Sequence, residues 1–187
     1  MLESLLQFDQ QLFLFINQSL ANPVTDFFMP IITNDMFLRI IYGLALILLL
    51  VRGKKPFIWI VVFSLLVVAL TDQVSSAWLK PFFERLRPCK ELNVHLLVNC
   101  GSGYSFPSSH AANLFGQAVF FSLLFPRAKW YWLVFAFLVA ISRVFVGVHY
   151  PLDITAGAVL GTFIGFVVAC MLLHLNQKPW FKPRISV

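Results

Sequence analysis

The sequence contains few charged residues. Asp, Glu, Lys and Arg together make up 12% of its 187 residues, whereas soluble domains contain about 25%. Hydrophobic residues make up 59%, and the mean hydropathy is +0.82. This composition excludes a soluble domain, so the net charge of +6 does not indicate a nucleic-acid partner. We expect one integral membrane domain over residues 1–187.

The sequence also lacks a metal site and a secretory signal. Its four histidines are not accompanied by clustered carboxylates, so we predict no metal ligands and no cofactor. The N-terminus has neither the basic start nor the small-residue cleavage site of a signal peptide. The first residues are therefore interpreted as part of the folded protein.

Long apolar runs are what the sequence has instead. A helix that crosses a bilayer needs about 20 apolar residues, and an open strand edge is not stable in lipid. We therefore predict an all-α, polytopic helical bundle with five transmembrane helices. The first and third runs are short and must borrow residues from their flanks. The runs are 36–51, 56–79, 110–125, 129–148 and 152–175.

The N-terminal segment 1–35 has a different character. Polar residues interrupt its apolar ones, and Pro23 and Pro30 break it. We predict an amphipathic helix over 3–19 that lies in the membrane interface, followed by a short helix near 23–33. The alternative is that this segment forms a sixth span.

Basic residues predict the orientation of the bundle. If five helices cross alternately, eight of the 14 Lys and Arg residues lie on one side, and no acidic residue joins them. By the positive-inside rule this side and the C-terminus are cytoplasmic. The protein is then expected in a bacterial-type inner membrane. The eight residues are Arg52, Lys54, Lys55, Arg127, Lys129, Lys178, Lys182 and Arg184.

Three polar clusters converge on the opposite, outer side in this topology. They are "KPFFERLRP" at 80–88, "PSSH" at 107–110 and "SRVFVGVHYPLD" at 142–153. Lys80, Arg87 and Arg143 supply positive charge suited to a phosphate group. Because Arg143 lies within an apolar run, it is a candidate functional residue by default.

The second cluster suits an anion at a helix start. Ser108 is a natural N-cap, and the free backbone N–H groups near Ser109 and His110 would point at a bound phosphate. In the third cluster, Asp153 can orient His149, either along one helical face or across a helix start at Pro151. His149 would then attack phosphorus, and His110 would protonate the leaving oxygen.

These clusters resemble the three signatures of the type 2 phosphatidic acid phosphatase (PAP2) superfamily, K-x6-R-P, P-S-G-H and S-R-x5-H-x3-D. The resemblance covers about 56–175, the expected phosphatase core, and Ser109 departs from it by replacing a glycine. It implies a helical bundle with a metal-independent histidine mechanism. The implied roles are His149 as nucleophile, Asp153 as its partner, His110 as acid, and Lys80, Arg87, Ser108, Ser109 and Arg143 as phosphate ligands.

The expected function is a phosphatase acting on lipid phosphates or pyrophosphates at the outer membrane face. Candidate substrates are undecaprenyl pyrophosphate, phosphatidylglycerophosphate, phosphatidate and the 1-phosphate of lipid A. One alternative is a phosphotransferase that passes the phosphoryl group to a second lipid. Another is a non-enzymatic lipid-binding or transport protein.

Other residues receive structural interpretations. Cys89 and Cys100 bracket an outer loop and can form a disulfide, or both can remain free. Gly157, Gly161 and Gly165 indicate a close helix contact. Four charged residues near the outer loop are expected to be ordinary solvated charges: Glu84, Arg85, Lys90 and Glu91.

Overall fold

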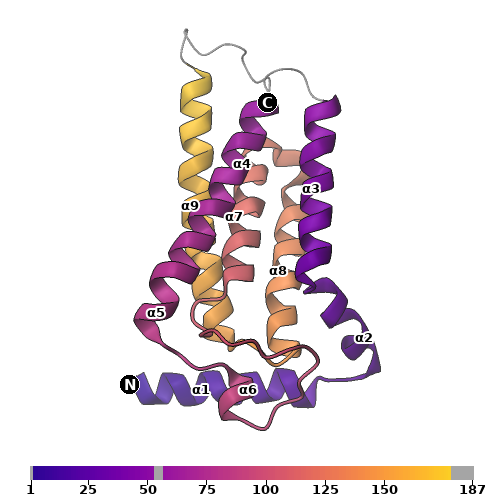
Figure 1. Cartoon of the computed structure of the whole chain (residues 1–187), viewed down its shortest axis with the longest axis vertical. Helices are drawn as coiled ribbons and strands as arrows, with labels where there is room; N and C mark the ends of the chain where they lie inside the picture. The colour runs from indigo at the N-terminus through magenta and orange to yellow at the C-terminus, as the bar shows by residue number, and fades with distance from the viewer. Residues whose placement is uncertain (1, 53–56, 178–187) are drawn as a thin grey trace.

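The protein is helical throughout the part described by the computed structural model, which covers residues 2–52 and 57–177. Five long helices run alternately up and down and form a bundle (Figure 1). They are α3 (Asp35–Arg52), α4 (Phe57–Asp72), α7 (Ser109–Leu124), α8 (Lys129–Phe145) and α9 (Pro151–Asn176).

Only some of these helices are long and apolar enough to span a membrane. Within residues 2–52 and 57–177, three helical stretches are long and apolar enough to cross a bilayer, namely Phe57–Glu91, Pro126–Phe145 and Pro151–Asn176. A fourth span results if Pro23–Ile32 and Asp35–Val51, which meet at 52°, count as one. Helix α7 has only 16 residues. The all-α membrane bundle is therefore confirmed, whereas the number of five spans stays a prediction.

Large apolar side chains on the outside of the bundle fit a lipid environment. Leu44, Val62, Phe137, Val159 and Phe163 are all between 46% and 67% exposed. Water-soluble proteins rarely present apolar surface of this extent on several elements. The outer faces of the helices are therefore suited to contact with acyl chains.

Helices α7 and α9 pack closely because small residues line their contact. A Cβ added at Gly161 would lie 2.1 Å from the carbonyl oxygen of Ala112, and one at Gly165 would lie 2.2 Å from that of Gly116. Only hydrogen fits at these positions, so the backbones approach each other directly. The close helix contact predicted from the glycines is confirmed.

The N-terminal segment lies across one end of the bundle (Figure 1). It consists of α1 (Leu2–Leu14), the π-helical turn η1 (Phe15–Ser19) and α2 (Pro23–Ile32). These bounds confirm the two predicted helices, whereas their location in the membrane interface stays a prediction. Asp9, Phe13 and Asn17 are buried. Four-residue spacing puts them on one face of the helix, so a partly polar face of the N-terminal helix packs against the bundle.

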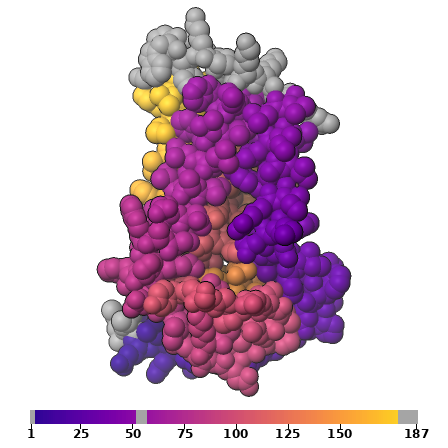
Figure 2. Space-filling view, in the orientation of Figure 1, coloured from indigo at the N-terminus to yellow at the C-terminus, as the bar shows by residue number. Residues whose placement is uncertain are grey.

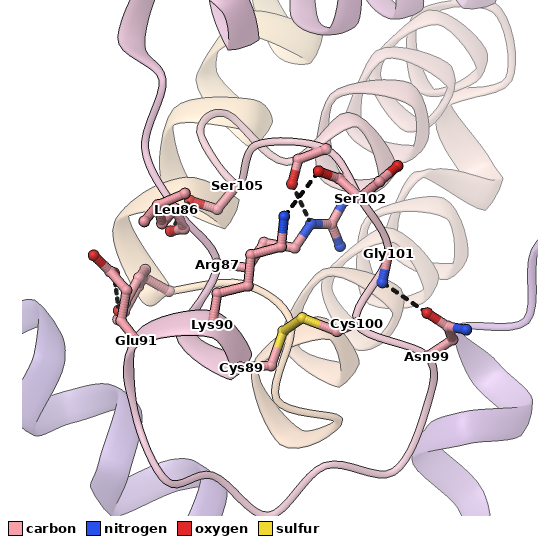
Figure 3. The surroundings of a disulfide bond; sticks show 12 residues. Leu86, Arg87, Cys89, Lys90, Glu91, Asn99, Cys100, Gly101, Ser102 and Ser105 are labelled. Carbon is pink, nitrogen blue, oxygen red and sulfur yellow. Dashed lines mark hydrogen bonds between the residues drawn. A yellow bond between two sulfur atoms is a disulfide. The ribbon is translucent and has the colours of Figure 1, made fainter.

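The same end of the bundle carries the outer loop. The π-helical segment η2 (Gln73–Leu79) extends α4, and the short helices α5 (Lys80–Phe83) and α6 (Pro88–Glu91) follow. Cys89 and Cys100 form a disulfide with 6.1 Å between their Cα atoms (Figure 3). The disulfide between Cys89 and Cys100, which the sequence left open, is therefore formed.

The connection between α7 and α8, which includes the turn η3 (Pro126–Ala128), lies at the opposite end (Figure 1). Arg127 and Lys129 are at this end. Figure 2 shows a hollow in the surface between α3 and α4, through which orange atoms of the bundle interior are visible. We call this feature the α3–α4 hollow.

Candidate active site

The three predicted clusters meet at the end of the bundle that carries the outer loop. The backbone N–H of Ser108, at the start of α7, donates to the carbonyl of Asp153 in the first turn of α9 at 2.9 Å. The N–H of Ser105 donates to the carbonyl of Arg85 at 2.8 Å, which ties the segment before α7 to the segment after α5. Residues far apart in the sequence are thereby joined around one site.

A histidine–carboxylate pair lies at the centre of this site. His149 is 2% exposed and sits in the loop between α8 and α9. Its Nδ1 atom lies 3.4 Å from Oδ2 of Asp153, which also accepts the N–H of Tyr150 at 2.8 Å. Asp153 is in the first turn of α9, which begins at Pro151. The pair therefore straddles a helix start, one of the two arrangements the sequence allowed.

Burial and neighbouring cations lower the pKa of His149 well below its ordinary value of 6.5. Burial is the main cause, and the charges of Arg143, Lys80, Arg87 and His110 act in the same direction. The imidazole is therefore neutral near neutral pH, as a nucleophile must be. All four residues lie close enough to His149 for their charges to act on its protonation.

The three cations are held in different ways. Arg143 is 8% exposed, and its Nη1 atom donates to Oγ1 of Thr33 at 2.6 Å. Lys80 donates from Nζ to the carbonyl of Tyr104 at 3.0 Å. Arg87 donates from Nε to the carbonyl of Gly103 at 3.1 Å, so its side chain points toward the segment that follows Cys100 (Figure 3). The segment between Cys100 and α7 thus positions two of the cations through its backbone carbonyls.

The start of α7 contains the serine pair. Ser108 occupies the N-cap position, but its side chain makes no capping hydrogen bond. The hydroxyl of Ser109 lies 3.1 Å from that of Ser75 and 2.9 Å from that of Ser76, both in η2. The serine that replaces the family's glycine therefore directs its hydroxyl toward η2.

Buried polar atoms without hydrogen-bond partners concentrate in this site. Among the described residues, four side-chain atoms are buried and unpartnered, and three of them are Oγ of Ser108, Nε2 of His110 and Nε of Arg143. An unsatisfied buried polar group costs about 1–3 kcal/mol. A bound phosphate would offer oxygen atoms to Ser108 and Arg143, whereas Nε2 of His110 already lies 3.1 Å from Oδ1 of Asp35. The unpartnered atoms of Ser108 and Arg143 therefore mark a candidate anion-binding site.

Two site contacts were not predicted from the sequence. Arg85 was expected to be a solvated loop charge, and this was wrong. Its side chain is 19% exposed and donates to Oδ1 of Asp153 at 2.8 Å and to Oδ2 of Asp9 at 2.6 Å. In addition, Oδ1 of Asp35 on α3 lies 3.1 Å from Nε2 of His110, which is an ion-pair contact when the imidazole is protonated.

No group of three or more His, Cys, Asp or Glu side chains arranged to hold a metal ion occurs in residues 2–52 and 57–177. The arrangement instead offers cations for a phosphate group, a neutral buried imidazole and a second imidazole beside a carboxylate. On an apolar helical bundle, such a site defines a membrane-bound phosphate-ester hydrolase.

Comparison with known proteins gives the family. The chain belongs to the PAP2 superfamily, whose family model matches residues 57–177. It is 38% identical over 181 residues to the lipid A 4'-phosphatase of Bacteroides thetaiotaomicron, covering 89% of this chain and 78% of that relative. It is 39% identical over 127 residues to the undecaprenyl-diphosphatase of Sulfolobus acidocaldarius, covering 66% of this chain and 58% of the relative.

A solved structure agrees with this assignment. The crystal structure of a transmembrane PAP2 type phosphatidylglycerolphosphate phosphatase from Bacillus subtilis is 26% identical in sequence. It superposes with a TM-score of 0.69 over 95% of this chain and 90% of that one. The protein is therefore a membrane phosphatase of the PAP2 superfamily.

Proposed function

We propose that the protein removes phosphate from a lipid phosphate or lipid pyrophosphate through a phosphohistidine at the outer face of the membrane. The observation that carries this proposal is the group of cations close to a buried histidine, because Arg143, Lys80 and Arg87 all act on the protonation of His149. Buried side-chain atoms of Ser108 and Arg143 that lack hydrogen-bond partners support it. Such a site favours a small anion over any uncharged ligand.

The first step forms a bond between Nε2 of His149 and phosphorus. Nδ1 faces Asp153, so Nε2 is the nitrogen left for attack. The P–O bond to the lipid breaks, its electron pair stays on the lipid oxygen, and His110 donates a proton to that oxygen. Lys80 and Arg143 stabilise the charge on the phosphoryl oxygens during the transfer.

The second step returns the enzyme to its starting state. Water attacks phosphorus, and His110 accepts a proton from the water. The P–N bond breaks, and its electron pair returns to Nε2 of His149. Inorganic phosphate is released, and Asp153 keeps the imidazole in the same orientation in both steps.

The outer-face location rests on the distribution of charge. The active-site end lies opposite the end with Arg127 and Lys129, and loops rich in Lys and Arg remain in the cytoplasm. Six further residues of the basic set that supports this orientation fall outside the described residues or have undescribed side chains. They are Arg52, Lys54, Lys55, Lys178, Lys182 and Arg184.

A lipid is the proposed substrate because the site sits at the end of apolar helices. The α3–α4 hollow opens on the side of the bundle (Figure 2), where an acyl or prenyl chain can approach from the bilayer. The relatives are named for lipid A, undecaprenyl diphosphate and phosphatidylglycerolphosphate. Lipid A is the first substrate to test, because the Bacteroides relative aligns with 89% of this chain.

The test is phosphate release by the purified protein from a panel of lipid phosphates and pyrophosphates. The panel includes lipid A, undecaprenyl pyrophosphate, phosphatidylglycerophosphate and phosphatidate, with no second lipid added. We expect release that persists in excess EDTA and is abolished in His149→Ala. A phosphotransferase would release little inorganic phosphate and, once an acceptor lipid is added, would transfer the phosphoryl group to that lipid. Full activity in His149→Ala would overturn the mechanism.

A further inference from the structure

A chain of charged groups links the N-terminal helix to the histidine–carboxylate pair. Asp9 on α1 accepts from Arg85, and Arg85 donates through its other Nη atom to Asp153. Asp9 and Asp153 are 1% and 0% exposed, and the Arg85 side chain is 19% exposed. Charged groups are rarely buried to this extent unless each has a fixed partner.

Further contacts fix this chain in place. The second carboxylate oxygen of Asp9 accepts the backbone N–H of Leu152 at 2.8 Å, in the first turn of α9. The guanidinium of Arg85 lies over the ring of Tyr150, 4.0 Å from its centroid. Phe13 packs edge-on against the same ring at 5.4 Å. Helix α1 is therefore attached to the segment that carries His149 and Asp153.

We infer that Asp9 and Arg85 are positioning residues for the nucleophile. The inference rests on the proposed function, because it assigns them to the orientation of His149 through Asp153. Arg85 holds Oδ1 of Asp153, so Oδ2 is directed to Nδ1 of His149. Asp9 holds Arg85 in turn and keeps its guanidinium in the plane that reaches Asp153.

Arginine suits this position better than lysine. A planar guanidinium presents separate N–H groups to two carboxylates and stacks on an aromatic ring, whereas an ammonium group does not hold two carboxylates in a fixed plane. If Asp153 rotates, His149 loses the partner that selects its tautomer, and the lone pair on Nε2 no longer faces phosphorus. Neither Asp9 nor Arg85 needs to touch the substrate for this effect.

The first variant is Asp9→Asn, which keeps the shape of the side chain and removes its charge. Loss of a residue that orients a catalytic group typically costs about 10- to 100-fold in activity. We expect kcat to fall by that factor with KM unchanged, because phosphate-binding groups are untouched. The matched control is Asp26→Asn. Asp26 on α2 also contacts a histidine, with 3.0 Å to Nε2 of His95, and we expect wild-type kcat from its variant.

A double-mutant cycle separates positioning from general destabilisation. Arg85→Lys is expected to lower kcat by a similar factor. Because Asp9 acts through Arg85, the double variant should be no slower than the slower single variant. Losses that multiply in the double variant would overturn the inference. Should Asp9→Asn not fold, a wild-type kcat in Arg85→Lys would overturn it equally.

Different results would overturn the positioning role of Asp9 and Arg85 and the proposed function of the protein. Wild-type kcat in Asp9→Asn, in a protein whose His149→Ala variant is inactive, would overturn the positioning role and leave the proposed function intact. Activity in His149→Ala would overturn the proposed function itself. Thermal unfolding of each variant in the same detergent measures folding independently of both outcomes.

Discussion

Gly157 is the position where helix packing and the candidate active site meet. A Cβ at this position would lie 2.4 Å from the carbonyl oxygen of Ser108 and 3.1 Å from the Cβ of Ala111. Ordinary contact begins at 3.4 Å, so the start of α7 must move by about 1 Å in Gly157→Ala. A displacement of that size in a catalytic group can lower the rate by about 100-fold.

Two controls isolate this effect. In Gly165→Ala the new Cβ meets the carbonyl of Gly116 at 2.2 Å, in the middle of α7, so the same crowding occurs away from Ser108. Both variants should lose about 1–3 kcal/mol of unfolding free energy from overpacking. In Gly43→Ala nothing lies within 4 Å, so stability should be unchanged or raised by up to about 1 kcal/mol.

The assay is lipid phosphate hydrolysis combined with thermal unfolding in detergent, at a temperature where all variants are folded. We expect kcat to fall about 100-fold in Gly157→Ala, by much less in Gly165→Ala, and not at all in Gly43→Ala. Equal rates for the folded Gly157→Ala and Gly165→Ala proteins would refute the claim that Ser108 must hold its position.

Two further predictions concern protonation. Burial and nearby cations lower the pKa of His149 below 6.5, so its imidazole stays neutral as the pH falls through 6.5. The acidic limb of the pH profile of kcat/KM should therefore lie below pH 6.5. An acidic limb at or above pH 6.5 would contradict this prediction. The carboxylate of Asp35 favours the protonated form of His110 at 3.1 Å, so Asp35→Asn should slow the release of an alkyl leaving group by about 10-fold or more. An aryl phosphate such as p-nitrophenyl phosphate needs little protonation of its leaving group and should be slowed less, whereas equal slowing of both substrates would count against a role for Asp35 through His110.

The convergence of the three clusters at one end of the bundle could be predicted from the sequence. Each of the three clusters is local, and the orientation of the helices, inferred from other charges, predicted that the clusters would meet. The N-terminal helices were likewise predicted from local signals, namely Pro23 and the polar residues around it. Local patterns of this kind are complete within a few residues, so they need no knowledge of tertiary contacts.

Contacts between distant segments could not be predicted in the same way. Arg85 is 76 residues from Asp9 and 68 from Asp153 along the chain, and a charged residue in a loop is solvated in most proteins. The sequence did contain one signal of the contact between the N-terminal helix and the bundle, but this signal was not decisive. Asp9, Phe13 and Asn17 recur every four residues, which marks one helical face, yet the polar members of that face suggested contact with water or headgroups.

The N-terminal 35 residues precede the match to the family model, which begins at residue 57. They nevertheless supply Asp9 to Arg85, Thr33 to Arg143 and Asp35 to His110. A version of the chain cut at the family boundary would thus keep every signature residue and lose the N-terminal partners of Arg85, Arg143 and His110. For protein engineering, we expect the smallest autonomous catalytic unit to be larger than the region that the family model matches, so grafts between relatives should carry their own N-terminal helices.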